Sequence, residues 1–294
     1  YSTLSVDIDR DKKTVTITIQ APVDKAPSKI EDILSQGDDF WLLRCARELD
    51  NAILHLRFNE LEIGIILFKT KGEMANILSY DKIFEIFENN WFIKEVSFYW
   101  GRVFKRIDLT SRTLTTLIEP GSCYAGFLCE LIFSADRSYM AEGEFEDFDN
   151  KEASIVLSNS NFGRFLMSND MSRLDTRFIG LPDQLLLTKQ NQSKYILAKE
   201  AYELGLMTFI YDDIDWDDEI RLFLEERSSF SPDSMVGMEA NLRFPGKETM
   251  ETKIFGRLTA WQNWIFQRPS AVGEEGALKK YGTGNKGMYT KERT

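Results

Sequence analysis

The chain has 294 residues, 43% hydrophobic and 28% charged, a composition typical of a globular protein that can bury a large core. Its formal net charge of -11 disfavours nucleic acid and membrane partners, because binding to either anionic surface depends on clustered lysines and arginines. With one histidine, His55, a two-histidine metal site cannot form, and we expect no metal.

The first half of the chain alternates between strand and helix patterns. Residues 4–8 and 15–19 alternate apolar with polar side chains on either side of the turn DRDKK, which predicts an amphipathic hairpin. Apolar residues at helical spacing predict helices over residues 39–56 and 92–107. The apolar stretches IGIILFKT and TLTTLIEP, one after each helix, predict strands buried on both faces. This alternation favours a single sheet rich in parallel strands.

The rest of the chain divides into the remainder of this domain and a helical extension. Short strands are expected at SYMAEG and EASIVLSN, and helical patterns dominate after Leu174. The last helix, from Glu248 to Gln267, carries apolar residues on more than one face, so we expect it to make an oligomer or inter-domain contact. The predicted divisions are residues 1–215 for the domain, 216–270 for the helical extension, and 271–294 for an extended tail rich in glycine and lysine.

One carboxylate of the domain is a candidate for chemistry. Glu130 lies among apolar residues in the stretch GSCYAGFLCELIFSADR, which predicts a short buried helix just after a strand. Such a carboxylate is either a working acid or base, or a structural group bonded to nearby backbone and hydroxyl groups, and burial would raise its pKa in both cases. The three cysteines show no C-x-x-C spacing and are predicted to be reduced thiols of a cytoplasmic protein.

Three blocks of the sequence, in order along the chain, resemble the crotonase (enoyl-CoA hydratase/isomerase) superfamily. They are GFLCELIFSAD, FGRFLMSNDMSRL and AKEAYELGLM, and the matching residues are Gly126, Glu130, Ala135, Asp136, Gly163, Arg173, Leu174, Ala198, Ala201, Gly205 and Leu206. The resemblance implies an α/β fold, the crotonase-like ββα spiral, with a C-terminal helical extension. It also implies an enzyme that acts on CoA thioesters.

The resemblance assigns candidate site residues. The family polarises the thioester carbonyl with two backbone N–H groups, while carboxylates move protons at the acyl carbons. Glu130 takes the place of one catalytic carboxylate, and Asn159, four residues before Gly163, takes the place of the second. An amide such as Asn159 can orient water or substrate but cannot act as a base. The candidate oxyanion-hole donors are the amides of Gly72 and Phe127.

A longer resemblance, through stretches such as ARELDNAILHLRFNELEIG and IDWDDEIRLFLEERSSFSPD, is to one ring-opening member of the superfamily that joins two crotonase-like halves. It implies that the chain is the C-terminal half of a CoA-thioester lyase or hydrolase of aromatic-compound degradation, and mainly its scaffold and dimer contact. The implied partners are an acyl-CoA substrate, a second crotonase-like half, and further copies of the chain. No cofactor is expected beyond the CoA of the substrate.

Two alternatives remain open. The chain could be an autonomous enoyl-CoA hydratase or isomerase that uses Glu130 with Asn159. It could also be an interaction module without catalysis.

Overall fold

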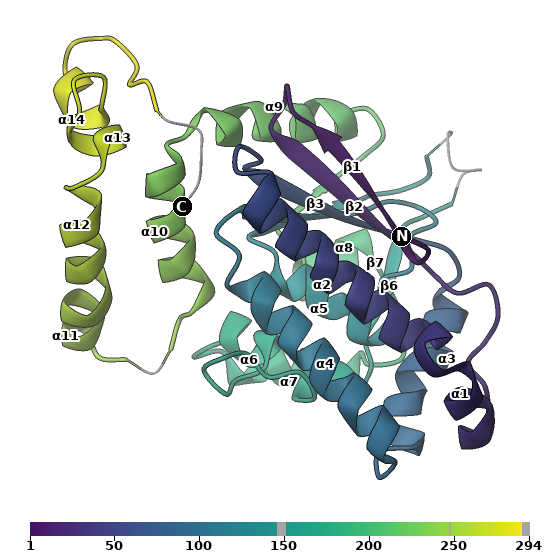
Figure 1. Ribbon diagram of the computed structural model, residues 1–294. Coiled ribbons are helices and arrows are strands. Elements are labelled where there is room, and N and C mark those ends of the chain that lie inside the picture. Colours follow the sequence, from purple (N-terminus) through teal and green to yellow (C-terminus); the bar gives the residue numbers. More distant parts are fainter. Residues whose placement is uncertain (146–150, 247, 290–294) are drawn as a thin grey trace.

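Six strands form the main sheet, in the spatial order β1-β2-β3-β4-β5-β8 (Figure 1). The computed structural model describes residues 1–145, 151–246 and 248–289. β1 and β2 form an antiparallel hairpin in which Leu4 lies opposite Ile19, and every later pair of neighbours is parallel. The strands are β1 (Leu4–Asp9), β2 (Thr14–Gln20), β3 (Ile65–Lys71), β4 (Thr113–Ile118), β5 (Arg137–Ala141) and β8 (Phe209–Tyr211).

The central strands consist of apolar and β-branched residues because both faces of the sheet are covered. Every residue of β4 is buried, and β3 is buried along its first four residues. Both strands follow the long helices in the order that the sequence pattern predicts. The predicted hairpin and the parallel-rich sheet are therefore confirmed.

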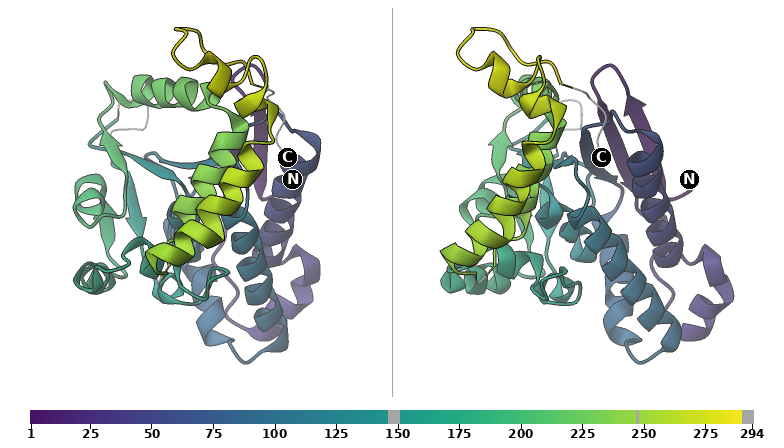
Figure 2. Two further views of the ribbon diagram at one scale, coloured as in Figure 1. Left: turned by 90° about the vertical axis from the view of Figure 1, so that its left-hand side faces the viewer. Right: turned by 60° about the vertical axis from the view of Figure 1, so that its left-hand side comes forward.

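Two long helices, α2 (Trp41–Asn59) and α4 (Trp91–Asp108), run side by side and cover the sheet (Figures 1 and 2). The indole Nε1 of Trp100 on α4 donates a hydrogen bond of 2.9 Å to the carbonyl of Leu42 on α2. Between them in the sequence comes α3 (Met74–Ile86), which the sequence pattern did not predict. Polar Asn76 and Asp81 lie on its buried face together with apolar residues, so α3 lacks a clear apolar stripe.

After β4 the chain forms short elements around the end of the sheet. β6 (Ser154–Val156) pairs antiparallel with β7 (Tyr195–Leu197) as a separate ribbon, and β8 adds the last strand of the main sheet beside β5. Neither β7 nor β8 was predicted, because strands of three residues are too short to show a period. The other helices here are α5 (Cys129–Ser134), α6 (Arg173–Arg177), α7 (Pro182–Gln190) and α8 (Ala198–Glu203), while the short helix α1 (Ile30–Gln36) precedes α2.

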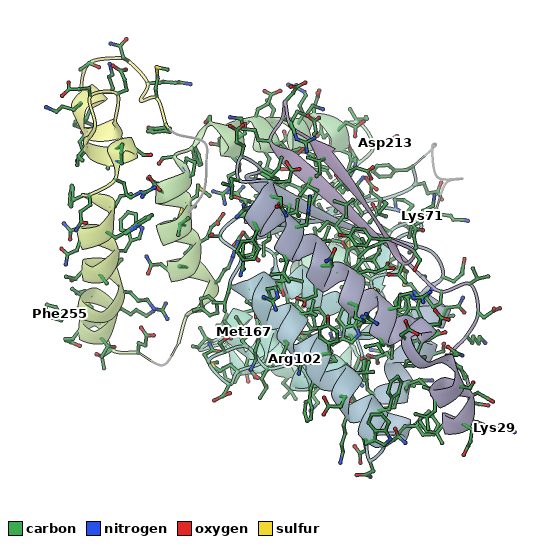
Figure 3. All side chains as sticks on the ribbon, in the orientation of Figure 1. Lys29, Lys71, Arg102, Met167, Asp213 and Phe255 are labelled. Carbon is green, nitrogen blue, oxygen red and sulfur yellow. The ribbon has the colours of Figure 1, made fainter. Side chains whose placement is uncertain are left out.

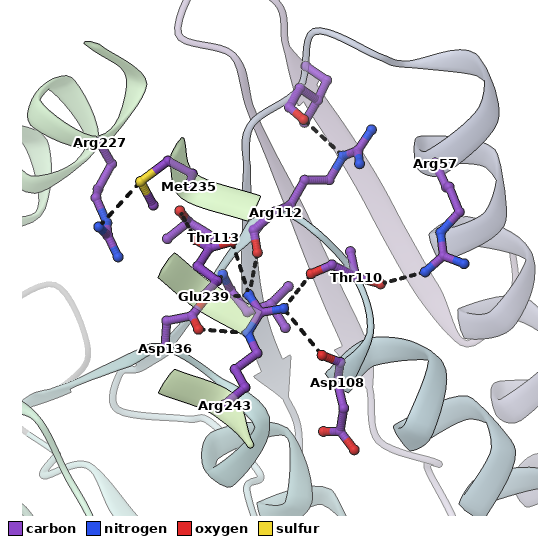
Figure 4. Close-up of polar contacts among 12 residues, drawn as sticks. Arg57, Asp108, Thr110, Arg112, Thr113, Asp136, Arg227, Met235, Glu239 and Arg243 are labelled. Atoms are coloured by element: carbon purple, nitrogen blue, oxygen red, sulfur yellow. Dashed lines mark hydrogen bonds and ion pairs between the residues drawn. The ribbon is translucent and has the colours of Figure 1, made fainter. Parts of the chain in front are cut away.

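The helical extension begins with α9 (Trp216–Ser229), which packs on the domain through core residues Trp216, Ile220 and Phe223. The next helix, α10 (Pro232–Arg243), is bonded to the ends of β4 and β5. Thr113 Oγ1 donates to Glu239 over 2.6 Å, and Arg243 Nε donates to Asp136 over 2.7 Å (Figure 4). The first two helices of the extension are therefore continuous with the domain.

The rest of the extension is a helical column beside α10 (Figure 2). It contains α11 (Met250–Lys253), the π-helical turn η5 (Ile254–Leu258) and α12 (Thr259–Ile265), close to the predicted helix from Glu248 to Gln267. The region of the predicted tail contains the end of α13 (Pro269–Val272) and all of α14 (Ala277–Lys280), while its residues 290–294 lie outside the described residues. Within the described ranges, no helix has the length and apolar character needed to cross a membrane.

A glycine sets the close approach of α10 to this column. A Cβ placed on Gly237 would lie 1.5 Å from the indole Nε1 of Trp261 on α12. Only a residue without a side chain leaves room for the indole there, so Gly237 and Trp261 fix how the two helices pack.

Gly237→Ala should loosen the contact between α10 and α12 by about 1–3 kcal/mol, because the added methyl group overlaps the Trp261 indole. Hydrogen exchange should then be faster in residues 259–265, measured by mass spectrometry on the whole chain.

Gly256→Ala is the matched control, because a Cβ on this helical glycine meets no atom within 4 Å. Alanine there should slow exchange, since it favours the helix by about 0.5–1 kcal/mol over glycine. Equal exchange in the two variants would contradict the close packing of Gly237.

Candidate functional site

Glu130 lies at the start of α5, which directly follows a tight turn between β4 and this helix. The turn is the 3₁₀ segment η2 (Gly126–Leu128), which Gly126 begins at φ 54°, in the left-handed region that favours glycine. A Cβ on Gly126 would lie 2.6 Å from the carboxyl carbon of Asp81 on α3, so a larger residue does not fit. The turn directs Glu130 into the protein, where the residue is 1% exposed.

Two donors hold the Glu130 carboxylate. Asn161 Nδ2 donates to Oε1 over 2.9 Å, and an amino nitrogen of Arg173 donates to Oε2 over 2.9 Å. Asn161 belongs to the 3₁₀ turn η4 (Asn159–Phe162), where it forms a capping box with Ser158, and its Nδ2 also donates to the Gly126 carbonyl. Each oxygen of Glu130 therefore already accepts a hydrogen bond from the protein.

Arg173 joins Glu130 to a second buried carboxylate. Its guanidinium binds both oxygens of Asp108, at the end of α4, over 3.1 and 2.7 Å, and donates to the Phe165 carbonyl over 2.8 Å. The guanidinium carbon also lies 5.2 Å from the centre of the Phe104 ring. One buried cation thus lies between two buried carboxylates, a costly arrangement unless every charged group is hydrogen-bonded, as it is here.

Burial and the neighbouring charges shift the pKa values of Glu130 and Arg173 in opposite directions. Burial raises the pKa of Glu130 to about 7, although the charge of Arg173 and the hydrogen bond from Asn161 favour the ionised form. Burial alone would lower the pKa of Arg173, but the charges of Asp108 and Glu130 outweigh this effect and raise it. Burial thus outweighs the stabilisation of the ionised form of Glu130 by Arg173 and Asn161.

Both amides that the resemblance assigns to an oxyanion hole have acceptors within the protein. The Phe127 N–H donates to Asp81 Oδ1 over 2.9 Å, and the Gly72 N–H donates to the Gly121 carbonyl over 3.1 Å. Asp81 is itself buried, and burial raises its pKa. The ring of Phe127 is fully buried, with its centre 4.8 Å from that of the Trp100 ring.

Asn159 lies apart from Glu130. Its side chain is exposed, and Oδ1 accepts a hydrogen bond of 2.8 Å from Gln192 Nε2. The asparagine that contacts Glu130 in the structure is Asn161. Counting back four residues from Gly163 gave Asn159 instead. The spacing of Ser158 and Asn161, which is that of a capping box, is the sequence signal that would have placed Asn161 at the start of a turn.

The part of the chain that the structure describes contains no cluster of three histidine, cysteine or acidic side chains that could hold a metal ion. The His55 ring lies on the protein surface beside the Asn59 side chain, with Nδ1 3.2 Å from Nδ2. All three cysteines are free and buried. Among the described residues, the ionisable group hydrogen-bonded to Glu130 is the Arg173 guanidinium, which also binds the Asp108 carboxylate.

Among curated proteins, the chain is similar in sequence to a lyase. It is 46% identical over 291 residues to a benzoyl-CoA-dihydrodiol lyase of Aromatoleum evansii, an alignment that covers 98% of this chain and 51% of that protein. The chain thus spans about half the length of the curated relative that it matches. No family model matches the chain.

Solved enoyl-CoA hydratases share the fold. The enzyme from Bacillus anthracis superposes with a TM-score of 0.64 at 14% identity, over 99% of this chain and 100% of that one. The enzyme from Mycobacterium smegmatis gives a TM-score of 0.65 at 14% identity, over 97% and 98% of the two chains. The chain has the crotonase fold with a helical C-terminal portion, so the predicted fold and resemblance are confirmed.

Glu130→Gln should gain stability relative to the wild type as the pH rises from 5 to 8. The pKa of Glu130 is about 7 in the folded state against an ordinary 4.5, so the folded protein binds this proton more tightly than the unfolded chain does. The resulting stability is fully present below pH 4.5 and is lost as the pH rises through 7, whereas glutamine cannot ionise. Urea unfolding at both pH values should show a relative shift of about 2–3 kcal/mol.

Glu225→Gln is the matched control for this shift. Glu225 is an exposed carboxylate on α9, and replacing it should change the free energy of unfolding by less than about 0.5 kcal/mol at either pH. A Glu130→Gln difference that stays constant between pH 5 and 8 would contradict the raised pKa.

Proposed function

We propose that this chain is the scaffold half of a CoA-thioester lyase whose chemistry takes place in a second crotonase-like half. The observation that carries the proposal is the hydrogen bond from the Phe127 amide to the Asp81 carboxylate. In the crotonase resemblance this amide is a donor to the thioester oxygen, and here a buried carboxylate of the protein accepts from it.

Thioester chemistry on this scaffold needs free donors for the developing oxyanion. Preorganised donors of this kind each contribute about 3 kcal/mol to lowering the barrier. A carboxylate at the donor position opposes this role, because it would repel the negative charge that develops on a thioester oxygen. The second candidate donor, Gly72, is bonded to the Gly121 carbonyl.

Proton transfer needs a carboxylate that can reach the substrate. Glu130 is almost fully buried, and its two oxygens accept from Asn161 and Arg173. Asn159, the second residue of the alternative hydratase mechanism, faces Gln192 instead. These contacts favour a structural carboxylate over a catalytic one.

The similarity to one half of a benzoyl-CoA-dihydrodiol lyase supports the rest of the proposal. The complete protein would act on a dihydrodiol or epoxide of benzoyl-CoA and open its ring, with this chain as its C-terminal half. The other half would contain the working site. The only coenzyme would be the CoA of the substrate, and the protein would act in the cytoplasm.

The outer face of the α11–α12 column is the proposed contact with further copies or with the second half. Met250 and Phe255 there are 70% and 74% exposed, and Leu258 and Phe266 are about half exposed. Phe255 points away from the domain (Figure 3). Trp261, in contrast, packs against Gly237 inside the chain.

Calorimetric titration of the chain with benzoyl-CoA should show no saturable heat, and Glu130→Gln should behave like the wild type. Free CoA is the control ligand, because it lacks the acyl carbonyl that an oxyanion hole would recognise. Saturable binding of benzoyl-CoA, together with turnover that Glu130→Gln abolishes, would overturn the scaffold assignment in favour of an autonomous enzyme.

Phe255→Ser combined with Met250→Ser should shift the chain to a smaller species in multi-angle light scattering, because the substitutions remove apolar surface from the proposed contact. Phe58→Ser is the matched control, since Phe58 on α2 is similarly exposed but lies on a different helix. An unchanged mass in the double variant, at concentrations where the wild type is associated, would contradict the contact.

A further inference from the structure

A cavity of about 540 Å³ lies where α10 covers the corner between α5, β5 and α6. Asp108 and Arg173 of the buried ion network form part of its wall, and α9 and α10 contribute Arg227 and Glu239. Its size is that of a pocket for a small organic molecule. Neither Glu130 nor the candidate oxyanion amides line it.

Two buried polar atoms of residues in the wall of this cavity have no hydrogen-bond partner. They are Thr176 Oγ1 and Arg227 Nε. Their residues are 6% and 8% exposed and come from different helices, α6 and α9. An unpaired buried donor or acceptor is costly, so two beside one space indicate an unfilled binding position.

The wall also carries more positive than negative charge. Its guanidinium groups belong to Arg137, Arg173, Arg177, Arg227 and Arg243. Its carboxyl groups belong to Asp108, Asp136 and Glu239. The charge excess is two if every group is ionised.

The three carboxylates of the wall form ion pairs with two of its arginines. Arg173 pairs with Asp108, and Arg243 pairs with Asp136 and Glu239 (Figure 4). Within the described residues, Arg137, Arg177 and Arg227 have no carboxylate oxygen within 4 Å.

Two of these three cations are partly desolvated. Burial lowers the pKa of Arg177 to about 10 and also lowers that of Arg227, which the charge of Glu239 offsets only in part. An anion in the cavity would neutralise this excess of charge.

We propose that this cavity binds a molecule that carries an oxyanion, a carboxylate or a phosphate group, with Arg227 and Arg177 as its charge partners and Thr176 as a hydroxyl donor. Guanidinium groups bind both kinds of oxyanion through paired N–H bonds. The oxyanion belongs either to a free small molecule or to an acidic side chain of another copy of the chain. Both sources share the same recognition chemistry.

The test uses the whole chain with sodium succinate and sodium phosphate as probes, against sodium chloride at equal ionic strength. We expect at least one probe to raise the melting temperature saturably and to give binding heat. Arg227→Met should weaken that binding at least tenfold, because it removes the cation and its unpaired Nε together.

Arg221→Met is the matched control, since Arg221 also lies on α9 but pairs at the surface with Asp218 and Glu225. It should bind the probe like the wild type. Arg227→Met should keep a cooperative melting transition without probe, because methionine can still pack against the Phe223 and Phe230 rings, so lost binding would not reflect unfolding. The proposal fails if neither probe exceeds chloride in the wild type, or if Arg227→Met retains the wild-type affinity.

Light scattering with the bound probe then separates the two sources. If an acidic side chain of another copy fills the cavity, saturating probe should reduce the mass of the associated species. If a free small molecule fills it, the mass should not change.

Discussion

The guanidinium of Arg173 is the interaction on which the centre of this domain depends. It connects the end of α4, the start of α5, the loop at Phe165 and its own helix α6, all away from water. Removing one partner from a buried ion network costs about 3–5 kcal/mol, because it leaves charge without compensation. Both the ion pairs of Arg173 and the apolar packing of α5 hold this helix in position. The same cation also forms part of the wall of the arginine-lined cavity.

These stabilising contacts explain why the polar groups of the candidate site already have partners within the chain. The resemblance gives Glu130 the place of a catalytic carboxylate, but in the structure its two oxygens accept hydrogen bonds from the groups that hold α5 in position. Asp81 has an equivalent effect on the Phe127 amide at the preceding turn. The amide at the helix start and the carboxylate of Glu130 thus both have their hydrogen-bond partners within the chain.

Much of the fold could be predicted from the sequence, and the contacts of the site could not. The hairpin, α2, α4, β3 and β4 each extend far enough for a hydrophobic period to show. β7 and β8 are too short for that, and α3 buries polar residues on its apolar side. Their existence depends on tertiary contacts that a local pattern does not contain.

The site depends on pairs that are distant in the sequence. Arg173 meets Asp108 across 65 positions and Glu130 across 43, and neither separation follows from a motif. The asparagine beside Glu130 differs by two positions from the one that alignment to the family implied. The turn at Gly126 has a further consequence for comparing such chains. Because Asp81 leaves no space for a Cβ there, steric fit alone suffices to retain this glycine, so a glycine at this position does not by itself indicate that the turn takes part in a reaction.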